Sequence, residues 1–320
     1  MHKNQNLKLK QYLTTFSRDN VGAYLKDIAS YVAKMTDDHV KILRSIEDLM
    51  RSNYVVSIDQ IVGRAGESRD YVGKIIEELH SMRLIWAPMG REKGYTLNFN
   101  GLDALALVAL SRRGILSFIG SRIGVGKEAE VYTGMTAEKN VVAVKFYRVG
   151  KMSIKKYKRF RAVDISHPNY LEASKRTAAK EIEALRILSS NNVPTPQPIA
   201  RNRHVIVTSL IDGDPLPKIK DIPRPKKVFE HIIDSIELAV DAGVIHCDLS
   251  AYNVLLRDNE EIIIIDWPQW VKPSHRMAEK YLERDVSNIV DFFAKRHHVL
   301  LDKTKYVKRF LNMLREHRGQ

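Results

Sequence analysis

The 320-residue sequence contains a single cysteine, Cys247, and has no hydrophobic run near the ~20 residues that a membrane span requires. The lone cysteine excludes an internal disulfide bond and favours a reducing compartment, so we expect a cytoplasmic protein with no membrane contact. The first ten residues are polar and basic, which is not the pattern of a secretory signal. Acidic residues are scarce: 38 Asp and Glu stand against 52 Lys and Arg, a net charge of +14. This excess predicts a polyanionic partner, with nucleic acid as the first candidate.

Two regions of different character follow one another along the chain. Apolar stripes and capping residues predict helices after Asp38, Ser57 and Ser68. A hairpin is then predicted, in which residues 84–86 pair with residues 95–97. Three helices and a hairpin are the order of a winged helix. Residues 99–113 predict a connecting helix, whose apolar run at 102–108 should pack against something. From residue 115 strands prevail, and helices follow at 225–242 and from about 277 to 316.

A glycine-rich turn joins the first two strands of this second region. Glycine lets the backbone approach phosphate closely, and free N–H groups can bind it, although a plain hairpin turn is the alternative. The turn is not a Walker A loop, because Glu128 occupies the position where Ser or Thr is needed. The residues that we assign to nucleotide binding here are Gly124, Val125, Gly126, Lys127, Glu128 and Val131.

The strand predicted at 141–147 carries Lys145 at the end of an apolar run. A lysine in that setting needs an anionic partner, which phosphate groups and a helix glutamate would supply. The helix predicted at 177–188 offers Glu181 and Glu183. Its apolar residues define a packed face with Glu181 on the edge and Glu183 pointing away, so Glu181 is favoured.

The loop at 245–253 places Asp248 and Asn253 five residues apart, ahead of two short strands that lead to Asp266. The spacing H-x-D-x-x-x-x-N followed by an aspartate is that of the catalytic loop in protein-kinase-like phosphotransferases. In that chemistry Asp248 accepts the proton or orients the attacking hydroxyl, and Asn253 with Asp266 holds Mg²⁺ through oxygen. His246 is then a structural hydrogen-bonding residue, and Cys247 a small filler.

The motifs G-x-G-K-E, V-A-V-K, H-x-D-L-S-x-x-N and I-D-W-P-Q together resemble the RIO family of atypical serine/threonine kinases. The preceding winged helix resembles its second, winged-helix-containing subtype, and the short length is closer to an archaeal member. The resemblance implies an α+β fold with a bilobal protein-kinase-like domain. We predict a winged-helix domain at 1–90, a linker helix at 91–114 and a RIO kinase domain at 115–320, with lobes at about 115–208 and 212–320.

The resemblance also implies a function: an ATP- and Mg²⁺-dependent serine kinase or ATPase, with Mn²⁺ as a substitute, that autophosphorylates and matures the small ribosomal subunit. Its partners would be rRNA and the precursor subunit, and the chain a monomer. Lys145, Asp248 and Asp266 would be catalytic, with Asp266 as the phosphorylated aspartate. Backbone groups of Ser209 and Ile211 would read adenine. Ala129 departs from the family, which usually has Ser there.

Between Lys145 and Arg161 there are eight Lys or Arg and no acidic residue, with aromatic residues interleaved. This composition suits contacts to RNA phosphates and unpaired bases, and Ser153 within it is a candidate autophosphorylation site. Two other functions stay open. One is a conventional phosphotransferase on a protein or small-molecule hydroxyl, against which the winged helix and the run after Asp266 weigh. The other is a winged-helix DNA-binding regulator with a vestigial kinase lobe.

Overall fold

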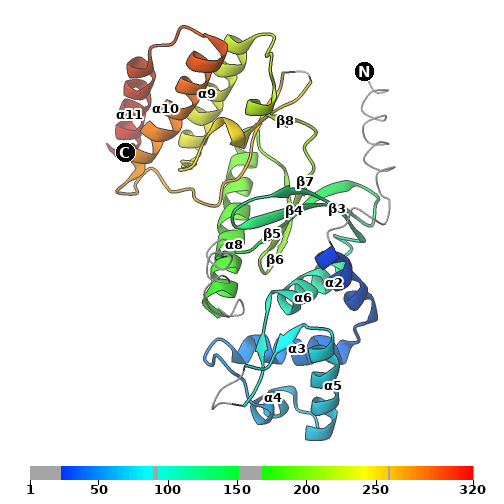
Figure 1. The fold of residues 1–320 in the computed structure, drawn as a ribbon. Helices are drawn as coiled ribbons and strands as arrows, with labels where there is room; N and C mark the ends of the chain where they lie inside the picture. The colour runs from blue at the N-terminus through cyan, green and yellow to red at the C-terminus, as the bar shows by residue number, and fades with distance from the viewer. Residues whose placement is uncertain (1–22, 89–92, 151–167, 259, 320) are drawn as a thin grey trace, which may run out of the picture. The chain divides into compact units, whose positions relative to one another are not determined.

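The structure is a computed structural model that describes residues 23–88, 93–150, 168–258 and 260–319 (Figure 1). The chain divides into two compact units: unit 1 is formed by 1–178 with 200–207, and unit 2 by 179–199 with 208–320. Among the described residues, no helix combines the length and the apolar character needed to cross a membrane.

Unit 1 begins with a helix, α2, that the sequence analysis did not predict, and continues with the winged-helix elements that it did. Thr36, Ser57 and Ser68 each accept a hydrogen bond from the backbone three residues on, so three helices begin directly after them. Gly66, with φ of 69°, ends the second of these in the left-handed conformation that glycine favours. The elements are α2 (Ala23–Lys34), α3 (Asp37–Leu49), α4 (Ile58–Ala65), α5 (Arg69–Ser81), β1 (Ile85–Trp86) and β2 (Thr96–Leu97).

The predicted connecting helix is α6 (Phe99–Arg112), which Asn98 caps. A Cβ at Gly101 would lie 2.2 Å from the carbonyl oxygen of Leu84, so only glycine lets α6 approach the hairpin this closely. Residues 101–108 of α6 are all buried, because α6 lies between the winged-helix elements and the sheet that follows (Figure 1). One hydrophobic core therefore runs from α3 and α5 through α6 to Phe146 and Val205.

The sheet of five strands has the order β3-β4-β5-β7-β6. Its first three strands are antiparallel neighbours, and along β5 the buried Val142, Val144 and Phe146 alternate with more exposed residues. This period of two places one face of β5 on the core and leaves the other for binding. The strands are β3 (Phe118–Val125), β4 (Ala129–Met135), β5 (Val141–Tyr147), β6 (Pro198–Asn202) and β7 (Val205–Ser209).

Unit 2 is mainly helical, with a small sheet of order β10-β9-β8. The short strands predicted at 254–256 and 262–265 are present as an antiparallel pair. The region predicted as helical from 277 to 316 is two helices, because His298 adopts a left-handed φ of 53°. The elements are α9 (Pro225–Asp241), α10 (Ala278–His297), α11 (Lys303–Gly319), β8 (Asp214–Pro215), β9 (Val254–Leu256), β10 (Ile262–Ile264) and the 3₁₀ turns Leu216–Lys218 and Ala251–Asn253.

The helix predicted at 177–188 is longer than expected. It is α8 (Pro168–Ser190), whose first residues belong to unit 1 and the rest to unit 2. Proline suits the first turn of a helix, because its missing N–H would have no partner there anyway. The prediction was therefore right about the helix and wrong about where it begins.

Candidate active site

Three predicted binding residues form one row across the sheet of unit 1. Gly124 on β3 pairs with Val131 on β4, and Val131 pairs with Lys145 on β5. Because Val144 and Phe146 are buried in the core, Lys145 projects from the opposite face, where its ammonium lies 5.0 Å from the centre of the Tyr147 ring. The pairing register thus brings glycine, an apolar residue and a lysine to one surface.

The turn between β3 and β4 is exposed from Val125 to Glu128. It is closed by Gly126 N–H, which donates to the carbonyl of Ala129 at 2.8 Å. Neither Gly124 nor Gly126 has a left-handed backbone, and a Cβ at either would make only ordinary contacts, at 3.5 Å or more. The fold of unit 1 therefore does not require these glycines, which leaves close approach of a ligand as a reason for them.

In unit 2, Asn253 and Asp266 lie at the same end of a hairpin. Asn253 immediately precedes β9, Asp266 follows β10 by one residue, and the N–H of Ile265 donates to the Asn253 carbonyl at 2.9 Å. The side-chain amide of Asn253 donates to the carbonyl of Asp248 at 2.9 Å, while the Asp248 side chain is exposed. The structure therefore brings Asp248, Asn253 and Asp266 together, as the spacing predicts.

His246 has the structural role that the sequence predicts. Its Nδ1 accepts from the N–H of Asp248 at 3.3 Å, so the proton sits on Nε2 and is donated to the carbonyl of Ile265 at 3.1 Å. Burial lowers the pKa of His246, which keeps the ring neutral, and the ring packs 4.5 Å from that of Trp267. Burial, with the Asp285 charge, raises the pKa of the Cys247 thiol to about 12, so it is no nucleophile at neutral pH.

Asp285 on α10 is the residue that the sequence reasoning missed. It is almost fully buried, and its two carboxylate oxygens accept from the N–H groups of Cys247 at 2.7 Å and Leu249 at 3.0 Å, on either side of Asp248. The guanidinium of Arg284 also donates to the Cys247 carbonyl. Burial raises the pKa of Asp285 to about 7, against the opposing effect of the two N–H groups. A signal that could have found it is the run Glu283-Arg284-Asp285-Val286, which also resembles the RIO family.

Glu181 is more buried than predicted. Instead of lying at the edge of the packed face, it is 3% exposed and accepts from the N–H of Trp267 at 3.3 Å, whereas Glu183 is exposed as expected. The indole N–H of Trp270 donates to the Lys180 carbonyl at 2.8 Å. The segment after Asp266, through Trp267 and Trp270, is therefore hydrogen-bonded to α8 within unit 2.

The two residues predicted to read adenine lie at the end of β7 and just beyond it. The N–H of Ser209 donates to the Gln197 carbonyl at 2.9 Å, and its hydroxyl accepts from the Gln197 N–H at 2.9 Å. The Ser209 carbonyl accepts from the Thr208 hydroxyl at 3.3 Å, and its second lone pair is the backbone position of Ser209 that a ligand could use. Ile211 is partly buried beyond the end of β7. Most of the basic segment, including Ser153, lies outside the described residues.

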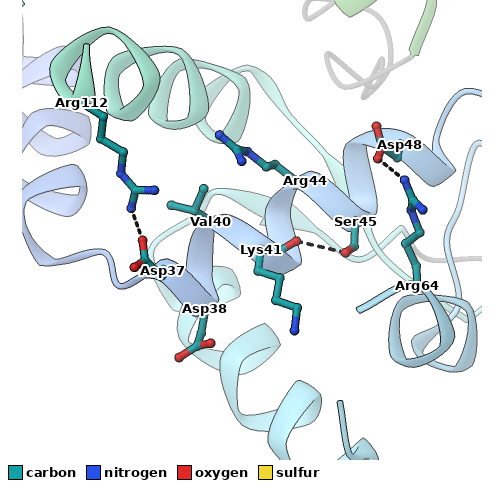
Figure 2. A pocket seen from close by; sticks show the side chains of 9 residues that line it. All are labelled: Asp37, Asp38, Val40, Lys41, Arg44, Ser45, Asp48, Arg64 and Arg112. Carbon is teal, nitrogen blue, oxygen red and sulfur yellow. Dashed lines mark hydrogen bonds and ion pairs between the residues drawn. The ribbon is translucent and has the colours of Figure 1, made fainter. Parts of the chain in front are cut away.

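Apart from these residues, unit 1 has a charged hollow of about 490 Å³ on α3 (Figure 2). At one end Arg112 pairs with Asp37, and at the other Arg64 pairs with Asp48 at 2.6 Å. Arg44 extends between the two pairs (Figure 2). The hollow contains none of the predicted site residues.

Comparison with known proteins decides the family. The family model described as "RIO domain" matches residues 130–306, and the one described as "Rio2, N-terminal" matches residues 32–113. The chain belongs to the RIO family. The predicted α+β architecture, a winged helix followed by a kinase-like domain, is confirmed, and the family is that of atypical serine/threonine kinases.

Several relatives of this RIO-family chain are known. It is 35% identical to the serine/threonine-protein kinase rio2 of Dictyostelium discoideum, over 82% of this chain and 51% of that protein. It is also 35% identical to the RIO-type serine/threonine-protein kinase Rio2 of Methanocaldococcus jannaschii, over 77% of this chain and 92% of that protein. The chain thus spans about half the length of the first relative and nearly all of the second.

Among solved structures, the Rio2 kinase–ADP/Mg²⁺–phosphoaspartate complex from Chaetomium thermophilum superposes with a TM-score of 0.78. It is 29% identical to this chain, and the match covers 87% of both chains. The same kinase, in a second structure, gives a TM-score of 0.76 at 30% identity. The likeness therefore extends over both the winged-helix part and the kinase-like part.

Proposed function

We propose that this chain is an ATP- and Mg²⁺-dependent atypical serine kinase or ATPase that acts on the precursor of the small ribosomal subunit. The enzymatic part of the proposal rests on the exposed carboxylate of Asp248. The backbone around it is fixed, because N–H groups on both sides of Asp248 donate to Asp285 and its own N–H donates to His246. A loop fixed so firmly around an exposed acid is built to present that acid to a substrate. The kinase names and the ADP complex of the relatives support the same reading.

In this proposal the sheet of unit 1 binds the phosphates of ATP. The exposed turn from Val125 to Glu128 offers its backbone N–H groups, and Lys145 offers its ammonium from the same face as Val131. The Ser209 carbonyl and the Ile211 amide are then the backbone groups for the adenine edge. Glu181, buried and already bonded to the backbone at Trp267, is proposed as the anionic partner that orients the lysine.

The residues at the end of the β9–β10 hairpin fit a magnesium ion. Mg²⁺ takes oxygen ligands, keeps several waters and needs only one or two protein groups besides substrate phosphates. Asn253 donates through its amide nitrogen to Asp248, so its amide oxygen faces away from that bond, and Asp266 adds a carboxylate. When bound, the ion would neutralise charge on the phosphates.

Asp248 is proposed to accept the proton of the attacking hydroxyl or water, or to orient it. Removing such a general base costs about 10² to 10⁴ in rate, so Asp248→Ala should lower kcat by that order while the protein stays folded. The matched control is Asp234→Ala, an exposed aspartate on α9 in the same unit. ATP turnover is measured for both variants. Equal turnover in wild type and Asp248→Ala would contradict the assignment.

A second step is proposed for Asp266. Its carboxylate oxygen would attack the γ-phosphorus of ATP, so that the bond to ADP breaks, an acyl phosphate forms and water later releases inorganic phosphate. The phosphoaspartate in the Chaetomium thermophilum complex supports this step. Incubation with γ-labelled ATP followed by acid and base treatment tests it, because an acyl phosphate is hydrolysed in both, whereas phosphoserine survives acid. Finding only acid- and base-stable phosphate, such as that on a tyrosine, or acid-stable phosphoserine alone, would refute it.

The partner is proposed to be rRNA within the precursor subunit. The net charge of +14 supports a polyanion, and α3 adds the exposed Lys41 and Arg44 beside the hollow of Figure 2. Salt-titrated binding to rRNA and to duplex DNA separates the alternatives, since the slope counts the phosphates contacted. Preference for duplex DNA would favour the winged-helix regulator instead. Binding or turnover that does not respond to purified small subunits would exclude the ribosomal role.

A further inference from the structure

We propose that Asp103, on the connecting helix α6, is a positioning residue for the phosphate-binding turn and acts through Arg148. Asp103 lies far from the turn in sequence and is part of a helix that the family comparison assigns to the N-terminal region, residues 32–113. The inference rests on the proposed nucleotide binding. It adds a control of that binding from outside the kinase-like domain.

The two side chains form a fully enclosed fork-to-fork pair. Arg148 donates through one terminal nitrogen to Oδ1 of Asp103 at 2.7 Å and through the other to Oδ2 at 2.6 Å. The carboxylate is completely buried and the guanidinium 7% exposed. Burial alone would raise the pKa of Asp103, but Arg148 and His204 hold it below its ordinary value, so the pair is ionised. Such bidentate pairs fix direction as well as distance.

Two aromatic rings and a histidine pack around this pair and restrict the orientation of the Arg148 guanidinium. The guanidinium carbon lies 5.0 Å from the ring centre of Phe99 on α6 and 5.6 Å from that of Phe146 on β5. His204 adds a bond from Nε2 to Oδ1 of Asp103 at 2.7 Å, while its Nδ1 is buried with no partner in the described structure. Burial lowers the pKa of His204, so the ring is neutral, and its Nε2 lies 2.8 Å from Nη1 of Arg148 as well, so that the ring contacts both members of the pair. Arg148 thus has one orientation.

The backbone of Arg148 is hydrogen-bonded to the turn, so the fixed position of Arg148 also fixes the turn. Its N–H donates to the carbonyl of Glu128 at 2.6 Å, on the far side of the turn that Gly126 closes. The next N–H, of Val149, donates to the Ser174 hydroxyl at 3.0 Å. The Arg148 backbone therefore sets where Glu128 lies, and Glu128 ends the exposed stretch that would face phosphate. Lys145, three residues earlier, lies on β5, which ends at Tyr147 directly before Arg148.

Stability alone does not explain a buried ion pair. Removing two charges from water costs several kcal/mol, and apolar residues of similar volume often give an equally stable or more stable protein. What an apolar pair cannot supply is the fixed direction of a forked hydrogen bond. The pair Asp103–Arg148 is therefore retained for geometry, and the geometry that it fixes is that of the turn.

The experiment compares ATP with adenosine as ligands of the full chain. The test variant is the apolar pair Asp103→Leu/Arg148→Met, which keeps volume and should fold, as circular dichroism would verify. We expect its Kd for ATP to rise at least about tenfold while its Kd for adenosine stays within about twofold, because the turn faces phosphate and not the base. Asp103→Asn, which retains an oxygen acceptor, should show a smaller rise.

The matched control is Glu47→Gln. Glu47 on α3 forms a partly buried ion cluster with Arg203 at 2.6 Å and Lys175 at 2.8 Å in the same unit, but none of these bonds reaches the turn. Its Kd for ATP should be that of wild type. If the apolar pair binds ATP as wild type does, or loses adenosine and ATP affinity equally, the inference is overturned. If wild type binds no ATP at all, the proposed function itself fails.

Discussion

The substitution Asp285→Asn tests whether the loop around Asp248 is held from α10. An asparagine has the shape of aspartate, but only one of its two terminal atoms can accept a hydrogen bond. One of the N–H groups of Cys247 and Leu249 would therefore face an NH₂ group, donor against donor, in a fully buried place. The change removes a hydrogen bond without opening a cavity.

The magnitude follows from the two bonds. The measurement is made at about pH 8, above the pKa of about 7 of Asp285, so that its carboxylate is charged. Hydrogen bonds to a charged group contribute about 1.5–3 kcal/mol each, and a buried donor left unpaired costs about 1–3 kcal/mol. Asp285→Asn should therefore lower the free energy of unfolding by about 2–4 kcal/mol, less than the whole stability of an ordinary domain. Because both bonds flank Asp248, a shift of the loop by about 1 Å should also lower kcat for ATP turnover by about 10²-fold.

Urea unfolding followed by circular dichroism measures the first effect, and ATP turnover below the unfolding transition measures the second. Asp291→Asn is the matched control, since Asp291 lies on the same helix and pairs with Lys303 at the surface, at 3.0 Å. Such exposed pairs contribute about 0.2–1 kcal/mol. The reasoning is wrong if Asp285→Asn is no less stable than Asp291→Asn. A stability loss with unchanged kcat would refute only the link to Asp248.

Two further predictions concern unit 1. Burial lowers the pKa of His204 from 6.5, so the unfolded chain binds its proton first, and the contribution of His204 to the free energy of unfolding should fall as pH drops below about 6.5. His204→Gln keeps a donor toward Asp103 and removes this contribution, while those of His246 and His297 and the opposite one of Asp285 are the same in both proteins. Its urea midpoint should therefore fall less than that of wild type between pH 7 and pH 5.5; an equal slope in the two proteins would contradict this. Gly101→Ala, whose Cβ would meet the Leu84 carbonyl, should lose about 1–3 kcal/mol in thermal unfolding. Gly63→Ala, inside α4 with nothing within 4 Å, should gain about 0.5–1 kcal/mol, and equal effects of the two would refute the packing argument.

Local chemistry made much of the fold predictable. Ser57 and Ser68 mark helix starts because a hydroxyl can cap the N–H groups that a first turn leaves unpaired, and both caps are present. The β-branched run at 141–147 predicted a strand, which is present as β5 with these bounds. The spacing of Asp248 and Asn253 made their proximity predictable, since only four residues separate them and Asn253 ends a 3₁₀ turn. These features depend on neighbours in the sequence.

The residues that escaped prediction depend on distant parts of the chain. Asp285 lies 36 residues beyond Leu249, and nothing in an amphipathic helix marks which of its acids is buried. The start of α8 was missed because Pro168 was not taken as a first helical residue. Burial of Glu181 depends on Trp267, which folds back from 86 residues away. Contacts between residues so far apart in the sequence are set by tertiary packing, which the periodicity of a single segment does not encode.

Asp103 shows how such a residue could be found from sequence. It interrupts the run Leu102-Asp103-Ala104-Leu105-Ala106-Leu107-Val108, in a helix so apolar that no face is left for water. An ionised carboxylate cannot be buried there without a cation and hydrogen-bond donors, because the desolvation penalty exceeds any packing gain. The run therefore requires a basic partner from elsewhere in the chain. A charged residue within a helix that is apolar on every face is thus itself a signal of a long-range ion pair. In this chain the partner is Arg148, beside the turn that we propose to bind phosphate.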